Sequence, residues 1–373
     1  MNNLIISSDE GIAIALLRCL SLHNSNNHVI NVWKSNHASR FSRYRKSYFS
    51  YPMSTSIEKS EEFIEKVNEY CKEKKIDVIM ATGLWGTFLL SKIKTQLRCS
   101  IIYPTPTAEQ IRNLHNKWLF YNFLNENNLP APKTMILENI EQLGSLEIEF
   151  PIILKPLTLE NGNGVCKVES YHALEEQLLR SKQPTRLPTL VQEYIPGRDI
   201  VFGFLAKEGE LVAWTMLERM PGFIKFFRDE SLLELGRKIV ATCGYHGAGN
   251  FDVRLDERDG QVKFFEFNPR FWVSVTSSLF YGVDFIHLGT LLAQGKDLPQ
   301  ELKKEVDDTQ ELPYDVSPFF FKGLISGKYP FQGVKKDVAW QTLLDPLPSW
   351  HERLSYRFGW KEVYDSSLLE NTW

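Results

Sequence analysis

The sequence predicts an α/β protein in which residues 1–106 form a parallel sheet with helices on its faces. Four apolar runs of strand character occur there, at residues 4–6, 28–33, 77–80 and 100–103. Two runs with helical spacing alternate with them, at residues 12–22 and 57–75. Such alternation favours a parallel sheet, because each helix carries the chain back to start the next strand. No GxGxxG fingerprint follows the first strand, so a dinucleotide site is not expected.

A second, mixed part begins after Pro104-Thr105-Pro106, which interrupts the alternation. One helical stretch is expected over residues 107–127, and prolines at 130 and 132 end it. Residues 150–195 are expected to be mostly strand, with one helix near residues 172–182. Longer strands and two helices follow, and the last part of the chain has no periodic signal.

The composition of the chain limits the classes of binding partner that are expected. The formal net charge of −3 gives no electrostatic basis for binding nucleic acid or an anionic membrane. A short basic run at residues 40–46 is expected to be a solvated loop or to contact one small anion. No apolar stretch approaches the roughly 20 residues needed to cross a bilayer. The five cysteines are scattered without CxxC spacing and no signal sequence is evident, so a cytoplasmic protein without disulfides or structural zinc is expected.

A predicted hairpin carries the acidic residues of interest. Apolar and polar residues alternate around Asp252 and Arg254, which places both on one face of a strand. A turn at Asp259-Gly260 leads into a second strand, residues 262–268, and would bring Glu266 beside Asp252.

The second strand adds an amide oxygen to the two carboxylates. Glu266 and Asn268 share one face, and Phe265 and Phe267 are expected to point to the core. Together with Asp252, these side chains make the hard oxygen site that suits Mg²⁺.

Basic residues are candidates for phosphate contacts. Arg270, just beyond the second strand, can fork onto a phosphoryl oxygen. Lys155 lies in the otherwise apolar run 151–156 and needs a phosphate or a carboxylate as partner. Lys117 lies in the helical stretch, where a surface position is the alternative. The alternative for the hairpin is a solvated polar face on which Arg254 and Arg270 neutralise the acids.

A glycine loop and a bend complete the set. The loop contains Gly162, Asn163 and Gly164, and glycines allow backbone amides to approach phosphate oxygens closely. A simple hairpin turn is the alternative. Residues 190–197 form a strand that runs into a bend, and Asp199 follows as a candidate partner for a ribose hydroxyl.

Taken in order, these motifs resemble the ATP-grasp superfamily, in particular the carboxylate–amine ligases related to the carbamoyl-phosphate synthetase and D-alanine–D-alanine ligase groups. The matching segments are residues 115–117, 150–156, 162–165, 192–199, 249–254 and 266–271. The resemblance implies a Rossmann-like, parallel-sheet pre-ATP-grasp domain followed by a two-lobed α+β ATP-grasp domain. The implied parts are residues 1–106, then linker helices and a small lid lobe over 107–196, then a large catalytic lobe with a C-terminal extension over 197–373.

The resemblance also implies a site for ATP. The implied nucleotide-binding residues are Lys117, Lys155, Gly162, Asn163, Gly164, Gln192, Glu193, Tyr194, Ile195 and Asp199. The lysines would contact the phosphates and the glycine loop would close over them. Residues 192–195 would present backbone groups to adenine, and Asp199 would contact the ribose.

The implied reaction is an ATP-dependent ligation. Asp252, Glu266 and Asn268 would hold Mg²⁺ or Mn²⁺, and the catalytic cations would be Arg270, Arg254 and Lys155. A small-molecule carboxylate, an amino acid or a related acid, would attack the γ-phosphate, and an amine would capture the acyl phosphate. Two alternatives stay open: a bicarbonate-using carboxylase of the same fold, and a nucleotide-binding regulatory protein without turnover. A homodimer is common among the enzymes that the chain resembles.

Some positions depart from the family pattern. Asn116 stands where an acidic residue commonly precedes the lysine, and Val273 stands near the place of a glycine. Trp272 and Ser274 are candidates for lining the substrate pocket, with a core position as the alternative for Trp272. Candidates for holding the substrate carboxylate, each with a surface role as the alternative, are Arg219, Lys225 and Arg228.

Overall fold

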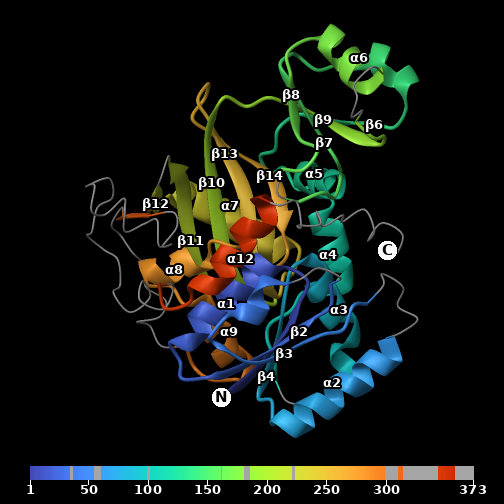
Figure 1. Cartoon of the computed structure of the whole chain (residues 1–373). Helices are drawn as coiled ribbons and strands as arrows, with labels where there is room; N and C mark the ends of the chain where they lie inside the picture. Colours follow the sequence, from blue (N-terminus) through green and yellow to red (C-terminus); the bar gives the residue numbers. More distant parts are fainter. Residues whose placement is uncertain are drawn as a thin grey trace.

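A computed structural model describes most of the chain and arranges it around three sheets (Figure 1). The described residues are 1–33, 37–53, 60–98, 101–160, 162–179, 185–220, 223–298, 310–313 and 343–357. Among these residues, no helix combines the length and the apolar character needed to span a membrane.

The N-terminal sheet is parallel throughout, with strand order β3-β2-β1-β4-β5. Its strands are β1 (Asn2–Ser7), β2 (Asn26–Asn31), β3 (Arg45–Ser50), β4 (Val78–Thr82) and β5 (Ile101–Ile102). The helices that accompany it are α1 (Glu10–Ser21), α2 (Ser60–Lys74) and α3 (Leu84–Ile93), with the short η1 (Ala38–Phe41) and η3 (Lys94–Gln96). The predicted α/β fold is therefore confirmed.

One strand of this sheet escaped the sequence analysis. The basic run at residues 40–46, expected as a loop, contains the end of η1 and the start of β3. β3 lies at the sheet edge and is only half buried, so it lacks the apolar run by which buried strands are recognised. Ser42 Oγ and Arg43 N donate to the carboxylate of Asp345, both at 2.8 Å, which fastens α12 (Pro346–Arg357) to this region.

The small lobe is a separate antiparallel sheet with order β6-β9-β7-β8 (green in Figure 1). Its strands are β6 (Thr134–Leu137), β7 (Ile152–Lys155), β8 (Cys166–Val168) and β9 (Thr189–Glu193). The short η4 (Ile140–Ser145) and the helix α6 (Tyr171–Leu179) complete the lobe, whose apolar cluster includes Leu154, Leu174 and Val191.

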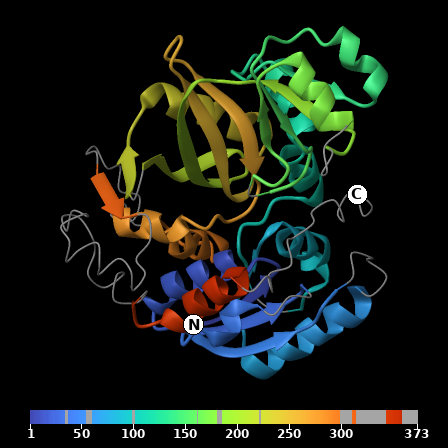
Figure 2. The ribbon, with the colours of Figure 1, turned by 45° about the horizontal axis from the view of Figure 1, so that its top comes forward.

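The large lobe is a long antiparallel sheet with order β14-β13-β10-β11-β12-β15. Its strands are β10 (Gly197–Lys207), β11 (Glu210–Met220), β12 (Phe223–Phe227), β13 (Gly247–Asp256), β14 (Val262–Asn268) and β15 (Gln310–Pro313). Figure 2 shows this sheet above the N-terminal sheet, with the small lobe to one side.

The two faces of the large sheet bury different partners. One face packs with α7 (Glu230–Thr242) in an aromatic cluster that contains Phe202, Phe251 and Phe267. The other face shares a core with the N-terminal domain and with α8 (Val275–Tyr281) and α9 (Phe285–Ala293). Because one apolar core joins the large lobe to the N-terminal sheet, the two form a common platform beneath the candidate site.

Candidate active site

The β13–β14 hairpin forms the floor of the site. The register pairs Asp252 with Glu266 and Asn250 with Asn268, so the predicted juxtaposition of the two carboxylates is confirmed. A register shift follows directly, because Val253 pairs with Phe264 and leaves Phe265 as a bulge.

The bulge changes which aromatic residues enter the core. Phe264 and Phe267 are fully buried, whereas Phe265 is only half buried. The prediction that Phe265 points to the core is wrong, because the extra residue reverses the alternation before Glu266. The Phe265 carbonyl instead accepts a hydrogen bond from Lys155 Nζ at 3.3 Å, and this Nζ lies 5.2 Å from the centroid of the Phe265 ring.

Asp252 lies in a buried polar network. Asn268 Nδ2 donates to Asp252 Oδ2 at 3.0 Å, and Asn250 Nδ2 approaches Asp252 Oδ1 at 3.4 Å. Burial raises the pKa of Asp252, and the neighbouring charge of Glu266 raises it further. The buried Oδ1 of Asn250 has no hydrogen-bond partner among the described residues. Two adjacent carboxylates and a free amide oxygen are groups that a bound cation would satisfy.

Two buried lysines face these acids. Lys117 begins α5 (Lys117–Glu126), directly after α4 (Ala108–His115), so the single helix expected over 107–127 is in fact two. Asn116 separates them with an extended backbone, and its side chain caps α5 by accepting from the Trp118 and Leu119 amides. The break positions Lys117, which is buried rather than on the surface, with Nζ 3.5 Å from Glu266 Oε1.

Lys155 ends β7 and is also buried. Burial lowers its pKa to about 7, and the nearby charge of Lys117 adds to this, against the opposing charges of Glu266 and Asp252. A bound polyphosphate would supply the anionic charge that keeps this ammonium protonated.

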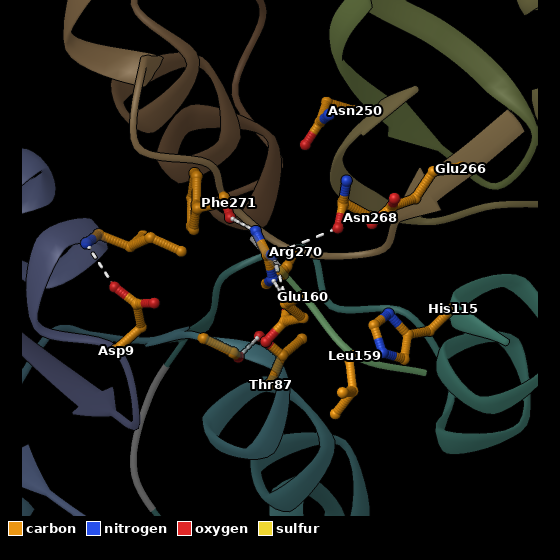
Figure 3. Close-up of polar contacts among 12 residues, drawn as sticks. Asp9, Thr87, His115, Leu159, Glu160, Asn250, Glu266, Asn268, Arg270 and Phe271 are labelled. Carbon is orange, nitrogen blue, oxygen red and sulfur yellow. Dashed lines mark hydrogen bonds and ion pairs between the residues drawn. The ribbon is translucent and has the colours of Figure 1, made fainter. Parts of the chain in front are cut away.

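Glu160 and Arg270 form a buried ion pair that sequence analysis missed (Figure 3). Arg270 Nε donates to Glu160 Oε1 at 2.7 Å, and Nη2 contacts the same oxygen. Nη2 also donates to Asn268 Oδ1 at 3.2 Å, and Nη1 donates to Phe271 O at 3.0 Å. The one signal in the sequence was an acidic residue at the start of the glycine loop.

The glycine loop begins at Glu160 and bends through two left-handed glycines. Gly162 and Gly164 both have φ of +72°, a region that L residues rarely adopt. A Cβ on Gly164 would also lie 2.7 Å from Pro156. Asn163 N donates to Glu160 O at 3.2 Å, while Asn161 lies outside the described residues.

The strand that leaves the small lobe carries the predicted adenine and ribose contacts. Gln192 Nε2 donates to Thr134 Oγ1 at 2.7 Å, and Glu193 Oε1 accepts from Lys133 N at 2.9 Å. These hydrogen bonds engage both side chains. The predicted contacts of residues 192–195 with adenine would therefore be made by backbone groups, and they stay a prediction.

Arg254 lies with this strand. Its Nε donates to Ile195 O at 2.7 Å, its Nη1 pairs with Asp199, and its guanidinium lies 5.9 Å from the ring centroid of Tyr194. Lys167 Nζ lies 4.1 Å from the same centroid. These contacts group Arg254 with the predicted nucleotide residues, and its catalytic role stays a prediction.

The three candidates for the substrate carboxylate separate in space. Arg219 is exposed on the sheet face that carries Asp252, and its charge opposes the rise in the pKa of Asp252. Arg228 pairs with Glu230 and lies over Trp214. Lys225 is in register with Glu218, one residue out of phase with Arg219, and therefore on the opposite face.

The pocket candidate Trp272 and the neighbouring Val273, which stands near the place of a glycine, differ in exposure. Trp272 is 4% exposed and lies against Gly203 and Phe285 in the core shared with the N-terminal domain. Val273 is 60% exposed. The core alternative for Trp272 is therefore confirmed, although its indole Nε1 has no hydrogen-bond acceptor among the described residues.

Comparisons with known proteins agree with this geometry. The family described as "ATP-grasp in the biosynthetic pathway with Ter operon" matches residues 185–314. A D-aspartate ligase of Enterococcus faecium is 25% identical over 277 residues, which are 64% of each chain. The arginine-specific carbamoyl phosphate synthase large chain of Geobacillus stearothermophilus is 25% identical over 253 residues, 61% of this chain and 23% of that one.

A solved structure supports the fold. The biotin carboxylase domain of Hydrogenobacter thermophilus 2-oxoglutarate carboxylase, a dimer in complex with MgADP, ADP and bicarbonate, superposes with a TM-score of 0.61. The sequences are 16% identical, and the match covers 80% of this chain and 72% of that one. The chain spans less than two thirds of the length of the two sequence relatives named above.

Proposed function

We propose that this chain is an ATP-grasp protein and an ATP- and Mg²⁺-dependent ligase that joins a small carboxylic acid to an amine. The observation that carries the proposal is the pairing of Asp252 with Glu266 on adjacent strands, surrounded by Lys117, Lys155 and Arg270. Two half-buried carboxylates facing three cations suit a metal–polyphosphate complex better than a solvated hairpin face.

The residues present fit Mg²⁺. Asp252, Glu266 and Asn268 would hold the ion, which prefers oxygen ligands. Among the described residues no cluster of three or more His, Cys, Asp or Glu side chains is arranged to hold a metal, so a softer or histidine-rich metal site is not supported. Bound with ATP, Mg²⁺ would neutralise phosphate charge and stabilise the charge that develops on the transferred group.

The protein's own side chains would position the ATP phosphates and neutralise their charge. Lys117 and Lys155 would hold the phosphates, and Arg270 would stabilise the phosphoryl group as it moves to the substrate carboxylate. An amine would then displace phosphate from the acyl phosphate. Of the three candidates, Arg219 lies on the sheet face that carries Asp252. It would bind a substrate carboxylate other than the one that receives the phosphoryl group, which favours an amino acid or a related acid as substrate.

The test is a screen of amino acids, alone and in pairs, for phosphate release from ATP, followed by mass spectrometry of the product. Glu266→Ala is expected to lower turnover by about 10²-fold or more, because it removes a metal ligand opposite Asp252. Glu257→Ala, an exposed residue at the turn of the same hairpin, is the matched control and should retain activity. Undiminished ligation by Glu266→Ala would refute the site.

Two other results would indicate another function. ADP release that depends on bicarbonate and on no amine would identify a carboxylase. Nucleotide binding by calorimetry without turnover across the whole panel would identify a regulatory protein.

A further inference from the structure

The segment that leads into the glycine loop, residues 157–160, occupies the groups expected to bind phosphate. Lys117 Nζ donates to the carbonyl of Leu159 at 2.8 Å, and the Lys117 amide donates to Leu157 O at 2.9 Å. His115 Nε2 donates to Thr158 O at 2.7 Å. Burial, and then the charge of Lys117, lower the pKa of His115 to about 3, so the imidazole is a neutral donor. We call residues 157–160 the stem.

The stem ends in a carboxylate on Arg270. Glu160 takes the edge of the guanidinium formed by Nε and Nη2, while Nη1 is bound to Phe271 O. The Nε–Nη2 edge is one of those through which arginine grips a phosphate with two parallel hydrogen bonds. The side chains are 7% and 10% exposed, so water does little to weaken the pair.

We propose that Glu160 is an internal latch, whose carboxylate holds the stem on Arg270 until the γ-phosphate of ATP displaces it. The inference rests on the proposed nucleotide site. Two anions cannot share one guanidinium edge without repelling each other, so the latch and the phosphoryl group exclude one another. Release of Glu160 frees the stem.

The latch would lower nucleotide affinity by a factor that the latched fraction sets. If the protein is latched about nine tenths of the time, the apparent Kd is raised about ten-fold over that of the open protein. Glu160→Gln removes the charge and keeps the size of the side chain. It is therefore expected to lower the Kd for a non-hydrolysable ATP analogue with Mg²⁺ by about ten-fold. Binding of AMP, which has no γ-phosphoryl group, should not change.

The experiment is calorimetry of the full chain with magnesium AMP-PNP and, separately, with AMP. Glu176→Gln, the same change at an exposed position on α6 of the small lobe, is the matched control and should bind like the wild type. Glu160→Asp keeps the charge but shortens the side chain, and intermediate tightening is expected. If circular dichroism shows that Glu160→Gln does not fold, Glu160→Asp decides.

Each result has one meaning. Tighter AMP-PNP binding by Glu160→Gln with unchanged AMP binding supports the latch. Equal or weaker AMP-PNP binding overturns it, and so does equal tightening for AMP, which would indicate a generally loosened lobe. If neither protein binds AMP-PNP, the latch and the nucleotide site both fail. If both bind equally well, the latch fails and the proposed nucleotide site stands.

Discussion

Asp252 offers a direct test of the electrostatics of the site, because it is a group whose removal should stabilise the protein. The substitution is Asp252→Asn, which keeps the shape of the side chain and removes a half-buried charge beside Glu266. Burial and the charge of Glu266 raise the pKa of Asp252, so the ionised carboxylate costs stability above that pKa, by about 1.4 kcal/mol for each pKa unit. The amide has one acceptor oxygen, so it gives up one of the bonds from Asn268 and Asn250, at a cost of about 1 kcal/mol. The expected net gain is about 1–3 kcal/mol at about pH 8.

The pH dependence of stability gives the sign of the Asp252→Asn effect independently. The pKa of Asp252 in the folded protein is raised above its ordinary value of 3.8. Between these two pKa values the folded state holds a proton that the unfolded state has lost. The stability deficit of the wild type therefore grows as pH rises through the folded pKa, and disappears below the ordinary pKa. The advantage of Asp252→Asn should be largest near pH 8 and should shrink toward about pH 4.

Urea unfolding followed by tryptophan fluorescence measures the effect, and Asp256→Asn is the matched control. Asp256 lies on the same strand, but Arg258 holds its carboxylate with Nε at 2.9 Å and Nη2 at 2.6 Å. The hydrogen bonds of Arg258 lower the pKa of Asp256, so this carboxylate stabilises above its ordinary pKa and loses that contribution as pH falls. Asp256→Asn should destabilise by about 1 kcal/mol.

A less stable Asp252→Asn at about pH 8, or a gain that does not shrink in acid, would refute this account of the site. Added Mg²⁺ supplies a second readout. It should stabilise the wild type by binding the folded state, and it should have little effect on Asp252→Asn, which has lost a metal ligand.

Two further predictions concern neighbouring groups. Without divalent metal, the affinity of the wild type for ATP should fall as pH rises above about 7, because Lys155, with its pKa lowered to about 7 by burial and by Lys117, must take up a proton when phosphate binds. Lys155→Met should abolish this slope in calorimetry, and a slope that persists would contradict the assignment. Gly203→Ala places a Cβ 2.3 Å from Cζ2 of the buried Trp272 and should cost about 1–3 kcal/mol in urea unfolding. Gly144→Ala, whose Cβ would meet nothing within 4 Å, is the control, and equal stabilities would show that Trp272 moves freely.

Local patterns predicted the hairpin well and its irregularity not at all. Alternation and the turn at Asp259-Gly260 suffice to pair Asp252 with Glu266, because a short turn leaves few registers. The bulge at Phe265 adds a residue without changing the composition of the strand, so alternation cannot reveal it. The same limit applies to Asn116, which is compatible with one long helix and also caps the second of two.

The sequence by itself determined the α/β class, the acidic hairpin and the identity of the cations, because these depend on neighbouring residues and on spacing within single elements. Only the tertiary structure decided which groups meet. Glu160 and Arg270 are 110 residues apart, as are Lys155 and the carbonyl of Phe265. Such contacts require a loop of the small lobe to close over a strand of the large one. Their geometry depends on how the lobes pack, and no local pattern encodes that packing.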